Sequence, residues 1–200
     1  MKKVILIGGC PFSGKTTLAR ELAAKDKYSC ISTDDLGAAV KAAVPDEDFH
    51  PMSGVPYPEY YVKYSINELI EHAATLHRRM VPSIKAVINA HANQSSPAVI
   101  EGWALYPDWI STLPYSNTDS LWLIASQEVL LNRIRADKQF YEKCSNPELM
   151  VRQYLARCVW QNNKFMTTAV SLGMKIINVD TAADINEPVK TAYDLLNRDS

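Results

Sequence analysis

Near its amino terminus the chain reads Gly9-Cys10-Pro11-Phe12-Ser13-Gly14-Lys15-Thr16. This segment matches the pattern G-x-x-x-x-G-K-[ST] at every fixed position. Gly9 and Gly14 allow the backbone to curl, so that successive N–H groups point inward at phosphate oxygens. Lys15 brings a cation to the β- and γ-phosphates, and the Thr16 hydroxyl is a ligand for Mg²⁺. The segment therefore predicts a nucleoside triphosphate site, with contacts from Gly9 through Thr17.

The sequence on either side of this loop supports the same interpretation. An apolar run at 2–8 predicts a buried strand, and 16–25 carries apolar residues at helical spacing. Three of the seven glycines of the chain lie in this one turn: Gly8, Gly9 and Gly14. An ordinary strand-to-helix turn is the alternative. A helix that begins at the loop adds the positive end of its dipole, which favours phosphate binding.

Further apolar runs alternate with helical patterns along the whole chain. The expected strands are 2–8, 28–33, 98–101, 120–125 and 175–179. The expected helices are 16–25, 34–44, 60–80, 82–92, 127–143, 147–172 and 187–197. Between 45 and 58, four prolines predict the longest loop. Because each strand is almost entirely apolar, we expect a single α/β domain, 1–200, with a parallel sheet covered on both faces.

Composition excludes several classes of protein. The 200 residues include 47% hydrophobic and 22% charged side chains, as in an ordinary globular domain. A net charge of −1 offers no general attraction to a polyanion, which disfavours nucleic-acid binding. No apolar run approaches the roughly 18 residues of a membrane span, and the first run is too short for a signal peptide. We therefore expect a cytoplasmic protein. Its four cysteines and four histidines match no zinc template.

Two segments together resemble a known family. Residues 9–19, followed by Ile31-Ser32-Thr33-Asp34-Asp35, resemble the small P-loop kinases. That group includes gluconate, shikimate and 2-phosphoglycerate kinases and the kinase domain of polynucleotide kinase. The resemblance implies a three-layer P-loop NTPase fold with sheet order 2-3-1-4-5 and a lid after the fourth strand, at about 133–152. It also implies a substrate-side helical region at about 45–93, where the similarity itself is vague.

Two acidic residues follow predicted strands. Asp34 matches the acidic position of the resembled kinases, and a carboxylate there orients the acceptor hydroxyl and accepts its proton. The alternative is that Asp34 or Asp35 caps the next helix, and we favour Asp35 as the cap. Glu101, after Val99-Ile100, is expected to hold Mg²⁺, as a Walker B acid does. Glu101 could instead bind substrate, orient the base or serve only a structural purpose.

Arginines follow the fourth predicted strand. In the resembled kinases, lid arginines close over the nucleotide, and this role falls to Arg133 or Arg135 here. A planar guanidinium stacks on adenine or clamps phosphate, and we assign Arg133 a catalytic contact as well. Arg152 and Arg157, on the following helix, could reach the transferring phosphoryl group. Each single arginine could equally be a solvated helix residue.

Aromatic and basic residues mark the vaguer part of the chain. Tyrosines at 57, 60, 61 and 64 adjoin the proline-rich loop, and His77-Arg78-Arg79 ends the first half of the following helical pattern. They could shape a pocket in which an arginine binds an acidic acceptor. We favour a core stripe with a charged helix terminus. Trp103 follows Glu101-Gly102 and either lines the acceptor pocket or packs against the next helix.

These observations predict a phosphotransferase. The expected cofactors are ATP and Mg²⁺, and the expected acceptor is a hydroxyl of a small metabolite, with sugar acids or phosphoglycerate-like molecules favoured. One alternative is a polynucleotide 5′-hydroxyl kinase, which the absence of basic excess disfavours. Another is a nucleotide-dependent switch that hydrolyses slowly, although the chain has no Asn-Lys-x-Asp guanine motif.

Overall fold

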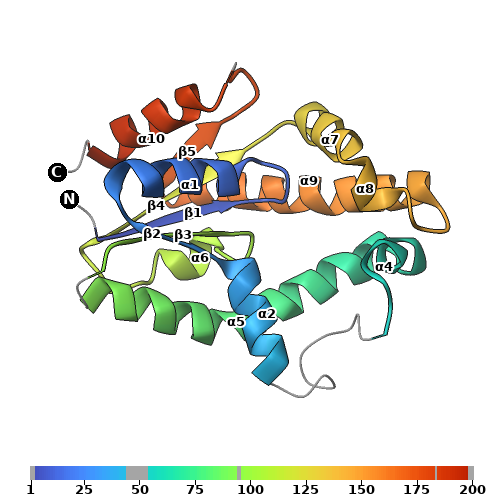
Figure 1. The fold of residues 1–200 in the computed structure, drawn as a ribbon, viewed down its shortest axis with the longest axis horizontal. Helices are drawn as coiled ribbons and strands as arrows, with labels where there is room; N and C mark the ends of the chain where they lie inside the picture. Colours follow the sequence, from blue (N-terminus) through green and yellow to red (C-terminus); the bar gives the residue numbers. More distant parts are fainter. Residues whose placement is uncertain (1–2, 44–53, 94–95, 183, 198–200) are drawn as a thin grey trace.

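A parallel sheet of five strands forms the middle layer of the protein (Figure 1). The computed structural model describes residues 3–43, 54–93, 96–182 and 184–197. The strands are β1 (Val4–Gly9), β2 (Ser29–Ser32), β3 (Ala98–Gly102), β4 (Thr118–Ile124) and β5 (Lys175–Asn178). Their order is β2-β3-β1-β4-β5 and every pairing is parallel, which confirms the expected fold class and strand order.

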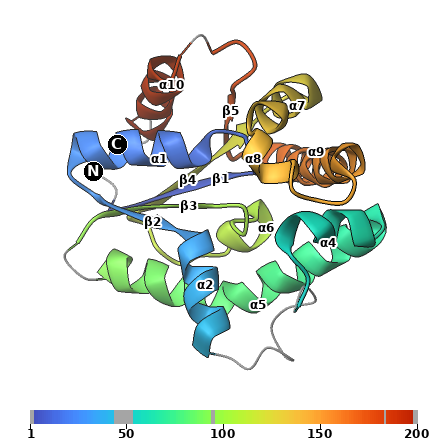
Figure 2. The ribbon, with the colours of Figure 1, turned by 45° about the vertical axis from the view of Figure 1, so that its right-hand side comes forward.

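Helices cover both faces of this sheet (Figure 2). On one face lie α1 (Lys15–Asp26) and α10 (Asn186–Asn197), and on the other lie α5 (Ile66–Asn93) and α6 (Pro107–Ile110). The central strand β1 is buried along its whole length. Ile5 and Ile7 pack with α1, whereas Val4 and Leu6 pack with α5. Alternate residues of the strand thus enter two separate cores, as its continuous apolar run requires.

The remaining helices lie towards the carboxyl ends of the strands. They are α2 (Thr33–Ala43), α4 (Tyr57–Lys63), α7 (Gln127–Ala136), α8 (Lys138–Tyr141) and α9 (Pro147–Ser171). Figure 1 shows α4, α7 and α8 grouped at one end of the molecule, beside α9. Among the described residues, no helix combines the length and the apolar character needed to cross a bilayer.

The helical region before β3 differs from the expected one. The sequence suggested helices at 60–80 and 82–92, but the chain breaks earlier, between α4 and α5. A reciprocal capping box starts α5: Glu68 Oε2 accepts from Ser65 N at 2.8 Å, and Ser65 Oγ accepts from Glu68 N at 3.5 Å. The first part of the expected substrate-side region, 45–53, lies outside the described residues.

Pro82 lies inside α5 and does not interrupt it, although the second of the two expected helices, 82–92, began at this proline. The proline removes one backbone donor, a cost of about 3 kcal/mol in an isolated helix. Met80, Ile84 and Ile88 lie on the buried side of the same stretch and pack beneath the sheet. Burying these side chains contributes about 1.5–3 kcal/mol each, so packing holds the helix together through the proline.

The single helix expected at 127–143 is also wrong, because it divides into α7 and α8. Asp137 separates them with φ −93° and ψ 72°, outside the helical region. Only α7 carries buried apolar residues, Leu130 and Ile134, whereas α8 buries none. Past Asp137 the partly buried Phe140 packs on Phe12 and Tyr154 from a separate short helix, so the chain turns to meet these rings and does not extend α7. The short α6 was not expected.

Candidate functional site

The phosphate loop forms between the end of β1 and the start of α1. Gly14 has φ +96°, a conformation that glycine adopts without steric cost. A Cβ on Gly9 would lie 2.5 Å from Ser13 Oγ, so the curl leaves no room for a side chain there. Phe12 also has a positive φ of 64°, which costs a non-glycine residue about 1 kcal/mol. The loop therefore has the tight backbone curl that the motif predicts.

Lys15 and Glu101 approach each other inside this curl. Lys15 is 7% exposed and Glu101 is 1% exposed, and 3.8 Å separates Lys15 Nζ from Glu101 Oε2. This distance is too long for a hydrogen bond, and no described residue gives Oε2 a hydrogen-bond partner. Buried Ser13 Oγ has none among the described residues either. The site thus presents unsatisfied polar atoms to whatever occupies the loop.

The sheet register explains why these residues meet. Glu101 of β3 lies opposite Ile7 of β1 on one side and opposite Ser32 of β2 on the other. The carboxyl ends of all three strands therefore reach the same edge, where open α/β sheets bind ligands. Glu101 lies at that edge beside the phosphate loop, as expected from its position after an apolar strand.

A cavity of about 570 Å³ opens from the phosphate loop. One side is the expected set of residues from Phe12 to Thr17, together with Arg133. The other side comes from the segment between β5 and α10, which the sequence analysis did not single out. Its members are Val179, Ala182, Asp184, Ile185 and Pro188. The signal available was positional: a loop after any strand of this sheet reaches the ligand edge.

The residues at the loop fit a magnesium ion held mainly by phosphate oxygens. Within the described ranges, no three histidine, cysteine or acidic side chains are grouped as a metal cage. Thr16 is only partly buried and lines the cavity, and Glu101 brings an unsatisfied buried carboxylate oxygen. Mg²⁺ in phosphate-binding sites commonly takes one or two protein oxygens plus phosphate and water, so this donor set suits it.

The two lid arginines have different surroundings. Arg133 Nη1 donates to the carbonyl oxygen of Phe12 at 2.9 Å, so it supports the strained residue of the loop and lines the nucleotide cavity. Arg135 lies in the solvent with Glu148, at 3.7 Å, and lines a different hollow. The structure therefore brings Arg133 to the nucleotide cavity and leaves Arg135 outside it.

Asp34 lies in the first turn of α2, directly after β2. Ser32 Oγ accepts from Asp34 N at 3.2 Å, so the helix is capped by Ser32 and not by the favoured Asp35. Asp34 Oδ1 accepts from the indole Nε1 of Trp103 at 2.7 Å. No described residue hydrogen-bonds to Oδ2 of Asp34, which leaves that oxygen available for a ligand.

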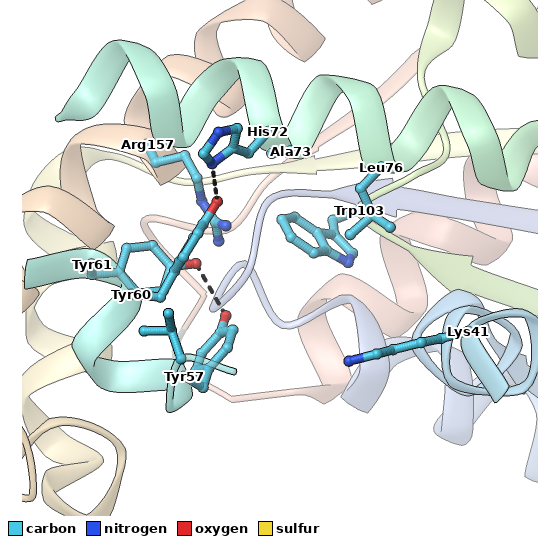
Figure 3. A pocket seen from close by; sticks show the side chains of 10 residues that line it. Lys41, Tyr57, Tyr60, Tyr61, His72, Ala73, Leu76, Trp103 and Arg157 are labelled. Atoms are coloured by element: carbon cyan, nitrogen blue, oxygen red, sulfur yellow. Dashed lines mark hydrogen bonds between the residues drawn. The ribbon is translucent and has the colours of Figure 1, made fainter. Parts of the chain in front are cut away.

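A second cavity, of about 350 Å³, lies beyond Trp103 and is called the acceptor cavity below. Its walls are Lys41, Val55, Tyr57, Tyr60, Tyr61, His72, Ala73, Leu76, Trp103 and Arg157 (Figure 3). Hydrogen bonds fix three of its tyrosines: one joins Tyr60 Oη and His72 Nδ1 at 2.8 Å, and another joins the Tyr57 and Tyr61 hydroxyls at 3.1 Å. Tyr60 and Tyr61 are also buried, so the tyrosines serve both core and pocket.

Four arginines were considered for contacts with the acceptor or the phosphoryl group, and they differ in burial: three are exposed and one is buried. Arg78 and Arg79 are exposed, and Arg78 bonds within its own helix to Ala74 O at 3.3 Å. Arg152 is exposed on α9 and lines the same hollow as Arg135. Arg157, one turn further along α9, is 3% exposed and lines the acceptor cavity.

An aromatic cluster joins the phosphate loop, the lid segment and the wall of the acceptor cavity. Phe12 of the loop packs on Phe140 of α8 at 5.7 Å and on Tyr154 of α9 at 5.8 Å between ring centroids. Tyr154 in turn packs on Tyr61 at 4.9 Å. Ser145 then bonds through its backbone N–H and its hydroxyl to the carboxylate of Glu59 on α4. The lid segment is thus packed over the loop and against α4.

His77 and Tyr106 form the support behind Trp103. The His77 ring lies 4.2 Å from the Trp103 ring between centroids, and its Nδ1 lies 3.2 Å from Tyr106 Oη. Burial, reinforced by the positive charge of Arg157, lowers the pKa of His77 from 6.5 to about 3. His77 is therefore neutral at physiological pH, and it positions Trp103 without adding charge.

Cys10 contributes backbone to the loop while its thiol lies in the core. The Sγ atom is 3.8 Å from Asn162 Oδ1, which also accepts from Ala125 N at 3.0 Å. Burial raises the pKa of the Cys10 thiol well above its usual value. The thiol is thus protonated and takes no part in the site chemistry.

Known proteins share both the sequence family and the fold. A family model described as an AAA domain matches residues 5–153. No curated protein sequence matches the chain at a significant level. Shikimate kinase from Bacteroides thetaiotaomicron is similar in structure, with a TM-score of 0.57 and 18% identity over 98% of this chain and 99% of that chain.

Two further solved structures share this fold. A gluconokinase from Sinorhizobium meliloti has a TM-score of 0.56 and 17% identity over 98% of this chain and 93% of its own. Deoxyadenosine kinase from M. mycoides, solved with bound dATP, has a TM-score of 0.53 and 16% identity over 97% of this chain and 99% of its own. The fold is therefore that of the small P-loop kinases.

Proposed function

The chain belongs to the AAA-domain family, and from that premise we propose that it is an ATP-dependent, Mg²⁺-requiring phosphotransferase. It transfers the γ-phosphoryl group to a hydroxyl of a small metabolite. The similar structures are named as kinases of shikimate, of gluconate and of deoxyadenosine, so they support a kinase without selecting one acceptor.

The observation that carries this proposal is the hydrogen bond of Asp34, at the carboxyl end of β2, to the wall of a second cavity. Lys15 and the phosphate loop line the first cavity, and Trp103 lines the second. Asp34 is fixed to Trp103 at 2.7 Å, with its other carboxylate oxygen unpaired among the described residues. A protein that only binds or hydrolyses a nucleotide needs no second cavity with a carboxylate at its edge.

The residues divide the work of phosphoryl transfer. Asp34 orients the acceptor hydroxyl and accepts its proton as the oxygen bonds to the γ-phosphorus and the bond to the β–γ bridging oxygen breaks, leaving ADP. Lys15 neutralises charge on the transferred group, and the backbone N–H groups of residues 12–16 bind the phosphates. Arg133 supports the loop through the Phe12 carbonyl group. Thr16 and Glu101 are the residues that would hold Mg²⁺, which supplies further neutralisation when bound.

The test is ATP consumption with Mg²⁺ across four classes of acceptor: phosphorylated acids, sugar acids, nucleosides and 5′-hydroxyl oligonucleotides. We expect one small acceptor to raise turnover well above the water background. Tight ATP binding without stimulation by any acceptor would instead indicate a slowly hydrolysing switch. Stimulation by oligonucleotides alone would indicate a polynucleotide kinase.

A further inference from the structure

The wall of the acceptor cavity contains a buried arginine surrounded by aromatic rings. The Arg157 guanidinium points into the space between Tyr60 and Trp103 (Figure 3). Its Cζ lies 4.5 Å from the ring centroid of Trp103, 4.9 Å from that of Tyr154 and 5.0 Å from that of Tyr61. The rings attract the cation but leave its N–H donors without an acceptor in their planes.

No described residue supplies a negative charge to this guanidinium. Arg157 Nε and Nη2 are both buried, and neither has a hydrogen-bond partner among the described residues. Burial raises the pKa of Tyr61 and of Tyr154 well above 10, so both hydroxyls stay neutral. A buried cation without an anion destabilises a fold, because its lost hydration is only partly replaced. Such an arrangement indicates a group reserved for a ligand.

The two unpaired nitrogens also specify a geometry. Nε–H and Nη2–H lie on one edge of the guanidinium and point in parallel, which is the edge that pairs with a carboxylate or phosphate through two hydrogen bonds. From the opposite side, Lys41 of α2 points its ammonium group towards the same space (Figure 3). The cavity is therefore positive at two points, between walls of aromatic and aliphatic side chains.

We propose that Arg157 binds an oxyanion of the phosphoryl acceptor, so that the acceptor is a compact anionic molecule carrying a carboxylate or a phosphate group. This inference rests on the proposed phosphotransferase function, because it identifies the acceptor class of the same site. An acceptor held at Arg157 lies along the ring of Trp103, whose indole N–H binds Asp34 at 2.7 Å. Its hydroxyl is thereby directed towards this carboxylate, and a cavity of about 350 Å³ suits a small molecule.

The test uses pairs of probes that differ in charge and hardly in shape. Benzoate is compared with benzamide, and phenyl phosphate with the neutral phenyl sulfamate, by NMR titration of the full chain. We expect the anion of at least one pair to bind wild-type protein at least tenfold more tightly than its neutral counterpart. Arg157→Met abolishes that preference, and Arg157→Lys keeps part of it. A preference for benzoate indicates a hydroxy acid as acceptor, and one for phenyl phosphate indicates a phosphate monoester.

The control is Arg20→Met, the same substitution at an exposed arginine of α1, which leaves the preference unchanged. The Arg157→Met variant lacks an unpaired buried charge, so we expect its melting temperature to be at or above that of the wild type. Loss of the preference for anions in this variant would therefore not be caused by unfolding. Equal binding within both pairs by the wild type, or a preference that survives Arg157→Met, overturns the inference.

The same variants distinguish this inference from the proposed function. Anion binding that depends on Arg157, without transfer to any hydroxyl compound, anionic or neutral, would overturn the phosphotransferase and leave the anion site. Transfer to neutral acceptors alone, with full activity in Arg157→Met, would support the phosphotransferase and overturn the anion site.

Discussion

The nucleotide cavity takes its phosphate-binding side from backbone, whereas the acceptor cavity is built from side chains. In the first, that side is formed by the consecutive residues 12–17, whose curl presents N–H groups to phosphate. The second takes its walls from α2, α4, α5, α9 and the end of β3, between positions 41 and 157. A site made of backbone serves one common ligand group in many proteins, while a site made of side chains is specific to its own ligand. Asp34 is hydrogen-bonded to Trp103 in the wall of the second.

The largest effect should follow from removing the cation of the nucleotide cavity. We expect Lys15→Ala to lower kcat about a thousandfold, because charge on the transferred group is no longer neutralised. The measurement is acceptor-dependent ATP consumption at saturating nucleotide. Lys25→Ala, at an exposed lysine of the same helix, serves as control. Full turnover in Lys15→Ala would mean that residues 9–16 are not a working phosphate loop.

The next effect tests the carboxylate of Asp34, which is hydrogen-bonded to the wall of the acceptor cavity. Asp34→Asn keeps an oxygen for the Trp103 hydrogen bond but removes the base, so we expect kcat to fall about a hundredfold. ATP affinity, measured by calorimetry, should stay within a factor of three. Asp35→Asn changes the neighbouring exposed carboxylate and should leave kcat unaffected. Equal losses in the two variants would remove the assignment of Asp34 as base.

A pH measurement sharpens the acceptor side of the comparison. The folded-state pKa of His77 is about 3 and the unfolded value is 6.5, so the unfolded chain binds more protons between these values. The contribution of the neutral His77 to the free energy of unfolding is therefore fully present above pH 6.5 and is lost as the pH decreases towards 3. Between pH 7 and pH 5 the loss at this site is about 2 kcal/mol. Urea unfolding should show that decrease in wild type beyond the decrease in His77→Leu. Parallel curves for the two proteins would contradict a neutral, buried His77.

The smallest effect distinguishes the two lid arginines. Arg133→Met loses the hydrogen bond to Phe12 O, and we expect the KM for ATP to rise about tenfold, as for a hydrogen bond from a charged donor. Arg135 has only an exposed ion pair with Glu148, so Arg135→Met should change KM by less than a factor of two. Initial rates at varied ATP measure both. A larger effect at Arg135 would indicate that the lid rearranges around the nucleotide.

The contrast between the cavities also explains what the sequence could predict. The phosphate loop and the five strands are coded locally, by glycines at fixed spacing and by continuous apolar runs. The expected strand order, taken from the family resemblance, agrees with the observed one. The tyrosines were recognised as a group that could shape a pocket, although a core stripe was favoured. The arginine that enters this pocket, Arg157, comes from a helix almost a hundred residues away. Nothing local distinguishes Arg157 from Arg152, because burial depends on which turn of α9 faces α4.

The wrong expectations have the same origin. Pro82 was treated as a helix boundary because its local effect is unfavourable, while the buried side of α5 outweighs that effect. The helix at 127–143 was extended past Asp137 because polar residues there suit a helix, whereas Phe140 packs on Phe12 and Tyr154 from a separate short helix. In each case long-range packing decided the outcome against local preference.

The burial of Cys10 has a practical consequence for optical studies of this protein. A thiol held protonated in the core reacts slowly with maleimides, because the thiolate is the reactive species. Cys158 is buried as well, and the half-buried thiol of Cys144 donates to Tyr141 O at 3.1 Å. Cys30 is exposed on the edge strand β2, so a fluorescent dye attaches there first. Labelled molecules would keep an unmodified phosphate loop while their dye reports from the strand that leads to Asp34.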